Sequence, residues 1–123
     1  MIDEGTARRT SLQISDELAM LGATIGAGSN LDTSSVSLTA LKDKLDPSLD
    51  IYADVILNPA FPEADFARLQ KIQIARIAQE KASPFGMALR VFPKLVYGAG
   101  HPYAIPFTGS GYADTVAKLT RAD

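Results

Sequence analysis

The sequence lacks several residues on which common active sites depend. None of its 123 residues is cysteine, which excludes disulfides and thiolate metal sites. A single histidine, His101, excludes any site that needs two histidines within the chain. No Gly-x-Ser-x-Gly motif is present to support a Ser-His-Asp arrangement. No apolar run approaches the roughly 20 residues of a membrane span.

Charge and size narrow the function classes further. The net charge is −2 and the isoelectric point is about 5.3, so the basic surface that nucleic-acid binding requires is not indicated. Hydrophobic residues make up 46% of the chain and charged residues 21%. This balance is typical of one small globular domain, or of part of a larger one.

A pair of β-strands is predicted within residues 22–41 (GATIGAGSNLDTSSVSLTAL). Thr24 and Ile25 favour a strand. Gly26 and Gly28 weaken it and allow another backbone to come close. The first strand is therefore predicted to be only weakly stabilised and to be accessible to another backbone.

The second strand has a clearer pattern than the first. Residues 30–32 (Asn-Leu-Asp) are predicted to form the turn. Residues 34–41 alternate between polar and apolar side chains, which predicts a half-buried strand. The apolar members of this alternation are Val36, Leu38 and Ala40.

Helices are predicted on both sides of the strand pair. Thr10 and Gln13 fit a capping box, and the apolar spacing that follows predicts a helix over Ser11–Leu21, closed by Gly22. Asp46 and Pro47 are typical of a cap and a first helical position. The apolar stripe expected in this second helix consists of Leu49, Tyr52, Ala53 and Ile56.

Prolines divide the rest of the chain into further helices. A third helix is predicted from Pro62 to about Ala82, and a fourth from Pro84, which Pro93 should kink or end. Residues 97–111 are predicted to form a long ordered loop and residues 113–119 a short helix. The core stripe expected in the third helix consists of Phe66, Leu69, Ile72 and Ile77.

This order of elements predicts an α+β fold, with an antiparallel sheet and helices packed on one face. Gly5 is typical of the end of a helix, and residues 120–123 of the start of one. We therefore expect residues 1–123 to form part of a domain that continues beyond both ends.

Five segments, in order, resemble one family. They are MIDEGT, LGATIGAGSNLDTSSVSLTAL, LDIYADVILNPAFPEADF, EKASP and LVYGAGHPYAIPFTGS. Their order and spacing resemble the insulinase- or pitrilysin-like zinc peptidases, which include mitochondrial processing peptidase. The resemblance implies a partial peptidase domain without its N-terminal strand or strands, its His-x-x-Glu-His helix and its C-terminal strands.

The resemblance bears directly on zinc. In this family the His-x-x-Glu-His helix binds zinc and activates water, and it would lead into residues 1–6; no such motif is present here. The third family ligand, a Glu, falls at Arg76, and a guanidinium cannot ligate zinc. Glu80 and His101 remain as candidate ligands. The resemblance implies no catalytic residue and no zinc in this chain.

The resemblance also assigns a role to the first strand. In active members this strand carries Asn-Ala-x-Thr and accepts substrate as an added strand. Here the matching residues are Gly26, Ala27, Gly28 and Ser29, so the Asn and Thr side chains are missing. The candidate peptide-docking edge consists of Thr24, Ile25, Gly26, Ala27, Gly28 and Ser29.

A simpler interpretation stands beside each candidate. His101 is interpreted as a loop histidine bonded to backbone, and Glu80 as a solvated or capping residue. Asp3 and Glu4 are adjacent, so they do not share a helix face as a paired acid site would. The two glycines of the first strand lack the Lys-Ser/Thr of a phosphate-binding loop.

The function implied by the resemblance is that of a non-catalytic fragment. It would help form the peptide-binding chamber for an active half or subunit of the same family, with unfolded peptide as the ligand. Two alternatives are a piece of an active zinc endopeptidase whose motif precedes Met1, and a scaffold like the core subunits of the respiratory cytochrome bc1 complex. Exposed apolar surface in such a piece predicts a homodimer or aggregation. Bacterial members of the family suggest a periplasmic or envelope location.

Overall fold

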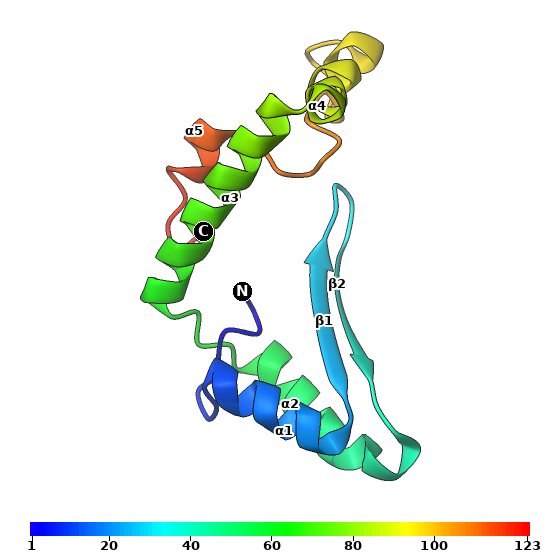
Figure 1. The fold of residues 1–123 in the computed structure, drawn as a ribbon, viewed down its shortest axis with the longest axis vertical. Coiled ribbons are helices and arrows are strands. Elements are labelled where there is room, and N and C mark those ends of the chain that lie inside the picture. The colour runs from blue at the N-terminus through cyan, green and yellow to red at the C-terminus, as the bar shows by residue number, and fades with distance from the viewer. The chain divides into compact units, whose positions relative to one another are not determined.

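The computed structural model describes residues 1–123. The chain divides into an N-terminal unit, Met1–Phe66, and a C-terminal unit, Ala67–Asp123, which are described separately. Five α-helices, one short 3-10 turn and one two-stranded antiparallel sheet make up the two units (Figure 1). The fold is α+β, as the sequence predicts. None of the helices combines the length and apolar character needed to cross a membrane.

Helix α1 (Ser11–Leu21) confirms the predicted capping signals. The Thr10 hydroxyl accepts a hydrogen bond from the Gln13 N–H, and the Gln13 side chain accepts one from the Thr10 N–H. At the other end Gly22 adopts φ 61°, a left-handed conformation that glycine reaches at low energy. Both ends of α1 are therefore fixed by local sequence.

Strands β1 (Thr24–Ser29) and β2 (Ser34–Thr39) form the predicted hairpin. Asn30 closes the turn, because its side-chain oxygen accepts hydrogen bonds from the N–H groups of Asp32 and Thr33. The alternation predicted for β2 is confirmed, with Val36 and Leu38 half-buried and their neighbours exposed.

The base of the hairpin is part of the N-terminal core. Helix α1 contacts β1, and helix α2 (Leu45–Leu57) contacts both α1 and β2. Figure 1 shows α1 and α2 side by side at the open end of the hairpin, with its turn projecting beyond them. The buried core consists of Ile14, Leu18, Ala23, Ile51 and Val55, with Ile2, Leu21, Ile25, Leu38 and Ala40 packed against it.

Helix α2 differs from its predicted form in two respects. It begins at Leu45, directly after a 3-10 turn at Lys42–Lys44, so Asp46 is not its cap. Pro47 is still tolerated, because the N–H groups of the first turn have no intrahelical partner. The predicted apolar stripe was also wrong: the buried residues are Ser48, Ile51, Asp54 and Val55.

The C-terminal unit is built on α3 (Glu63–Ala82), whose first residues belong to the N-terminal unit. Its predicted bounds are confirmed. Of its expected core stripe only Ile77 is fully buried, and Ile72 is 53% exposed. Helix α4 (Pro84–Tyr97) follows and is capped by Ser83. Gly86 lies so close to α3 that an added Cβ would come within 2.4 Å of the Glu80 carbonyl oxygen.

Pro93 does not end α4, so of the two predicted outcomes, a kink or an early end, the early end is wrong. A proline cannot donate to the carbonyl four residues earlier, which here belongs to Leu89. The N–H of Phe107, in the loop that follows the helix, donates to that carbonyl at 3.0 Å. A tertiary hydrogen bond thus replaces the missing helical one, and α4 continues to Tyr97.

The remaining segment is a loop followed by helix α5 (Ala113–Val116), three residues shorter than predicted. The side chain of Gln70 donates to the carbonyl of Val116, and that of Gln73 to the carbonyl of Ser110. These two bonds hold the end of the loop and α5 beside α3, as Figure 1 shows. At the C-terminus Asp123 accepts hydrogen bonds from Thr120, in the pattern of the predicted capping box.

Candidate functional site

The free edge of β1 presents backbone groups for pairing. The Asn30 N–H donates to the Thr33 carbonyl across the turn, so these residues form a hydrogen-bonded pair. Hydrogen-bonded and non-hydrogen-bonded pairs alternate along an antiparallel ladder. With the observed register, Ile25, Ala27 and Ser29 belong to non-hydrogen-bonded pairs, so their N–H and C=O groups point away from β2.

The outer edge of β2 differs from that of β1. Val36, opposite Ala27, points its carbonyl outward by the same alternation. The hydroxyl of Tyr52 on α2 donates to this carbonyl at 2.9 Å. Helix α2 therefore occupies part of the β2 edge, whereas β1 has no strand on its outer side.

Small side chains keep the β1 edge accessible to another backbone. Gly28 has open space where a Cβ would lie, and Gly26 has only the Ser37 hydroxyl near that position. The hydroxyl of Ser29 is engaged with that of Ser34 across the hairpin, at 2.8 Å. These residues offer backbone groups but no side-chain amide, and they form a strand, not a phosphate-binding loop.

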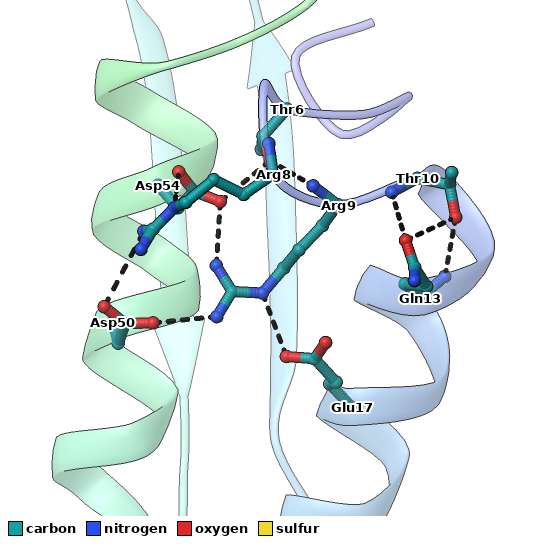
Figure 2. Close-up of polar contacts among 8 residues, drawn as sticks. All are labelled: Thr6, Arg8, Arg9, Thr10, Gln13, Glu17, Asp50 and Asp54. Carbon is teal, nitrogen blue, oxygen red and sulfur yellow. Dashed lines mark hydrogen bonds and ion pairs between the residues drawn. The ribbon is translucent and has the colours of Figure 1, made fainter.

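A second feature of the N-terminal unit is a charged cluster around Arg9. The guanidinium of Arg9 donates to Glu17 at 2.9 Å, to Asp50 at 2.8 Å and to Asp54 at 2.8 Å (Figure 2). Hydrogen bonds to Asp50 and then Asp54 raise the pKa of Arg9. One side chain thereby joins the segment before α1 to both α1 and α2.

The carboxylate of Asp54 is the buried centre of this cluster. It is 1% exposed and accepts hydrogen bonds from Thr6, Arg8, Arg9 and Asn58. Burial alone would raise its pKa, but these four hydrogen bonds outweigh burial and hold the pKa of Asp54 well below its usual range. Sequence reasoning missed this role: Asp54 lies next to Ala53 of the predicted apolar stripe, and no local pattern marks it as buried.

The C-terminal unit has its own buried carboxylate, at Glu80. One oxygen of Glu80 accepts hydrogen bonds from Arg90 at 2.9 Å, Ser110 at 2.6 Å and Thr108 at 3.1 Å. Burial would raise the pKa of Glu80, but the bonds from Ser110, Arg90 and Thr108 lower it. Arg90 also donates to the Gly111 carbonyl, so this cluster fixes the loop to α3 and α4.

The candidate zinc ligands do not form a zinc-binding set. Arg76 is exposed, with its nitrogen 3.7 Å from the second oxygen of Glu80. The side chain of Glu80 is 14% exposed and hydrogen-bonded to Arg90, Ser110 and Thr108, so it is not solvated. His101 stacks on Tyr97 at 4.8 Å and accepts a hydrogen bond from the Tyr103 N–H, which matches its interpretation as a loop histidine. No group of three potential ligand residues is found.

The acidic pair near the N-terminus lies beside a cavity of about 310 Å³. Asp3 forms an ion pair with the terminal amine of Met1 at 3.2 Å, and Glu4 lines the same cavity. The other lining includes Ile14, Leu18, Ile25 and Val55, which are residues of the core or packed against it. Ser11 and Ser15 complete the lining, and they add hydroxyl groups but no further titratable side chain.

Comparison with known proteins identifies the family. The model of the family Insulinase (Peptidase family M16) matches residues 1–95. The chain belongs to the insulinase family. A zinc protease of Rickettsia felis is 26% identical over 121 residues, which cover 98% of this chain and 29% of that protein. A zinc protease of Rickettsia bellii is also 26% identical, over 110 residues.

Two solved structures share this fold. A peptidase M16 inactive domain from Pseudomonas fluorescens is 32% identical, covers 99% of this chain and has a TM-score of 0.90. A protease from Helicobacter pylori, 19% identical with a TM-score of 0.83, shares the fold. The chain spans less than a third of the length of these relatives, 29% and 28% respectively.

Proposed function

We propose that this chain belongs to the non-catalytic half of an insulinase-family peptidase, where it holds extended peptide for an active partner. The observation that carries the proposal is at the third ligand position of the family. The family resemblance puts Arg76 at that position, and the nearest carboxylate, Glu80, is held by Arg90, Ser110 and Thr108. A protonated guanidinium cannot coordinate zinc, and the neighbouring Glu80 carboxylate already accepts hydrogen bonds from three side chains.

The comparisons support this assignment. The relative from Pseudomonas fluorescens is described as an inactive domain, and it matches 99% of the chain at 32% identity. The two Rickettsia relatives are zinc proteases, so zinc belongs to the family at large. The proposal places this chain with the inactive relative, on account of Arg76.

Peptide binding would use the backbone of β1. The N–H and C=O groups of Ile25, Ala27 and Ser29 are arranged to accept a third antiparallel or parallel strand. A cavity of about 380 Å³, lined by residues at the turn end of both strands and by Met1 and Ile2, offers room for peptide side chains. Because β1 supplies mainly backbone contacts, we expect weak dependence on peptide sequence.

Zinc binding tests the non-catalytic assignment. The longer protein of which this chain is expected to be a part is purified without its partner and dialysed against zinc, and bound metal is measured by atomic absorption and by competition with a chelating dye. We expect no stoichiometric tight zinc, and no chelator-sensitive cleavage of an unstructured peptide. One tightly bound zinc per chain would instead favour a piece of an active endopeptidase.

Proline substitutions test the peptide edge. Ala27→Pro removes an N–H that points away from β2, so the hairpin is preserved while peptide pairing is blocked. Ser34→Pro is the matched control, because its N–H points outward on the β2 side. Fluorescence anisotropy with a labelled unstructured peptide should show about tenfold weaker binding for Ala27→Pro, the loss of about one hydrogen bond. Equal weakening by Ser34→Pro would rule out selective use of β1.

The partner is tested by reconstitution. A zinc-bearing member of the family from the same organism is co-purified with the chain, and turnover of an unstructured peptide is compared with that of the zinc-bearing member alone. A rise in turnover supports a shared peptide chamber. A stable complex with unchanged turnover would point to the scaffold alternative.

A further inference from the structure

The exposed face of α4 carries an apolar stripe. Phe85 is 74% exposed, Phe92 54% and Leu95 76%, and Ala88 between them is exposed as well. The spacing of these four residues is three, four and three, the spacing that lines one side of a helix in coiled-coil packing. Val91 and Val96, which are 48% and 57% exposed, flank the stripe on either side.

The opposite face of α4 is already occupied within its own unit. Gly86 packs against the backbone of Glu80, Pro93 is buried, and the side chain of Arg90 is only 7% exposed. These contacts hold α4 against α3 and the loop that follows α4. Within the stripe, the ring of Phe92 packs edge-on against that of Phe107, with the ring centroids 6.5 Å apart, and the Phe92 side chain still remains 54% exposed.

We infer that this stripe binds the same stripe of a second copy of the chain, with the two α4 helices antiparallel about a two-fold axis near Arg90. An antiparallel pair centred there sets Phe92 of one copy opposite Ala88 of the other, and Phe85 opposite Leu95. Large side chains then face small ones at the centre of the contact, which allows close packing. A two-fold contact needs one self-complementary patch, which a single stripe of this kind provides.

The size and charge of the stripe suit a second copy. Its exposed side chains offer roughly 600 Å² per copy, so the pair would bury roughly 1,200 Å², at the lower end for a specific interface. Lys94 is the only charged residue on the exposed surface of α4, since Arg90 is buried in its ion pair. Lys94 lies on the opposite side of the helix from Phe85, so the two copies of Lys94 do not meet.

This dimer does not depend on the proposed peptide-holding function. Sedimentation velocity over a concentration series tests it, with Leu95→Glu as the disrupting variant. Leu12→Glu on α1 is the matched control, because Leu12 is 68% exposed and undergoes the same change on the other unit. We expect a concentration-dependent dimer whose dissociation constant rises at least tenfold in Leu95→Glu and is unchanged in Leu12→Glu.

Three results would overturn the inference. They are a monomer at the highest soluble concentration, an open-ended series of larger species, and equal dissociation by both variants. Circular dichroism of each variant confirms that helix content is retained, so loss of the dimer is not loss of fold.

Cross-linking tests the antiparallel register. The chain has no cysteine, so Phe85→Cys and Leu95→Cys each introduce a single thiol. When the two variants are mixed and oxidised with diamide, we expect the mixed disulfide to form several times faster than either symmetric one. Preferential cross-linking of each variant to itself would indicate a parallel pair and refute the proposed register.

Discussion

Removing the charge of Asp54 should destabilise the N-terminal unit more than any exposed charge change. The Asp54 carboxylate is buried and accepts hydrogen bonds from Thr6, Arg8, Arg9 and Asn58. Asp54→Asn keeps the shape but places an N–H₂ group among these donors and removes the buried carboxylate that pairs with Arg8 and Arg9. We expect a loss of about 3 kcal/mol in the free energy of unfolding, in the range found for broken buried ion pairs.

A matched variant and a chemical denaturation assay isolate this effect. Asp50 is also a partner of Arg9, but its side chain is 56% exposed, so Asp50→Asn should lose less than about 1 kcal/mol. In urea, a loss of about 3 kcal/mol lowers the midpoint by about 2 M if the slope is about 1.5 kcal/mol per M. Hydrogen exchange of peptides from α1 and α2 assigns the change to the N-terminal unit. Equal losses for the two variants would refute the assignment of stability to the buried carboxylate.

The same carboxylate predicts an acid transition. The pKa of Asp54 is lower in the folded protein than the value of about 3.9 in an unfolded chain. Its contribution is therefore complete above about pH 5 and decreases as the pH falls from there towards the folded pKa. Asp54→Asn should show a shallower loss of stability over this range. If the unfolding free energy of Asp54→Asn depends on pH as steeply as that of the unmodified protein, the acid transition is not due to Asp54.

Three further variants test the packing and the second buried carboxylate. Gly86→Ala adds a Cβ that meets the backbone of α3, so we expect a loss of about 2 kcal/mol in unfolding free energy. Unchanged stability in urea would mean that α3 and α4 can move apart at little energetic cost. Tyr52→Phe removes the hydrogen bond to Val36, and about 1 kcal/mol with it, so exchange of the β2 amides should rise. Hydrogen-exchange protection of the β2 amides equal to that in the unmodified protein would contradict a stabilising role for the Tyr52–Val36 hydrogen bond. Glu80→Gln leaves Arg90 without its charge partner, so the unfolding free energy should fall by about 2 kcal/mol. The stability of this variant should also depend less on acid below about pH 4.5. A loss of stability near zero would show that contacts other than those of Glu80 hold the loop.

Local sequence predicted most element boundaries. The capping box at Thr10, the left-handed Gly22, the polar turn at Asn30 and the proline before α3 each act within a few residues. These effects need no contact with distant parts of the chain. The helix α1, the hairpin and the bounds of α3 were therefore predictable.

The errors arose where distant residues decide the outcome. Pro93 was expected to kink or end α4, but the helix does not end there, because the N–H of Phe107 satisfies the carbonyl that proline leaves free. In α2 the buried face was mistaken, because Asp54 is drawn inward by Arg9 from another part of the chain. Neither partner can be identified from the residues next to the affected position.

The sequence alone determined the family resemblance, the missing His-x-x-Glu-His motif and the guanidinium at position 76. These depend on residue identity in a fixed order. Only the tertiary structure decided that Glu80 is enclosed by Arg90, Ser110 and Thr108, and that Tyr52 ties one edge of the hairpin while β1 stays open. The physical reason is that hydrogen bonding and burial join residues far apart in the chain, and local sequence carries no record of which groups will meet.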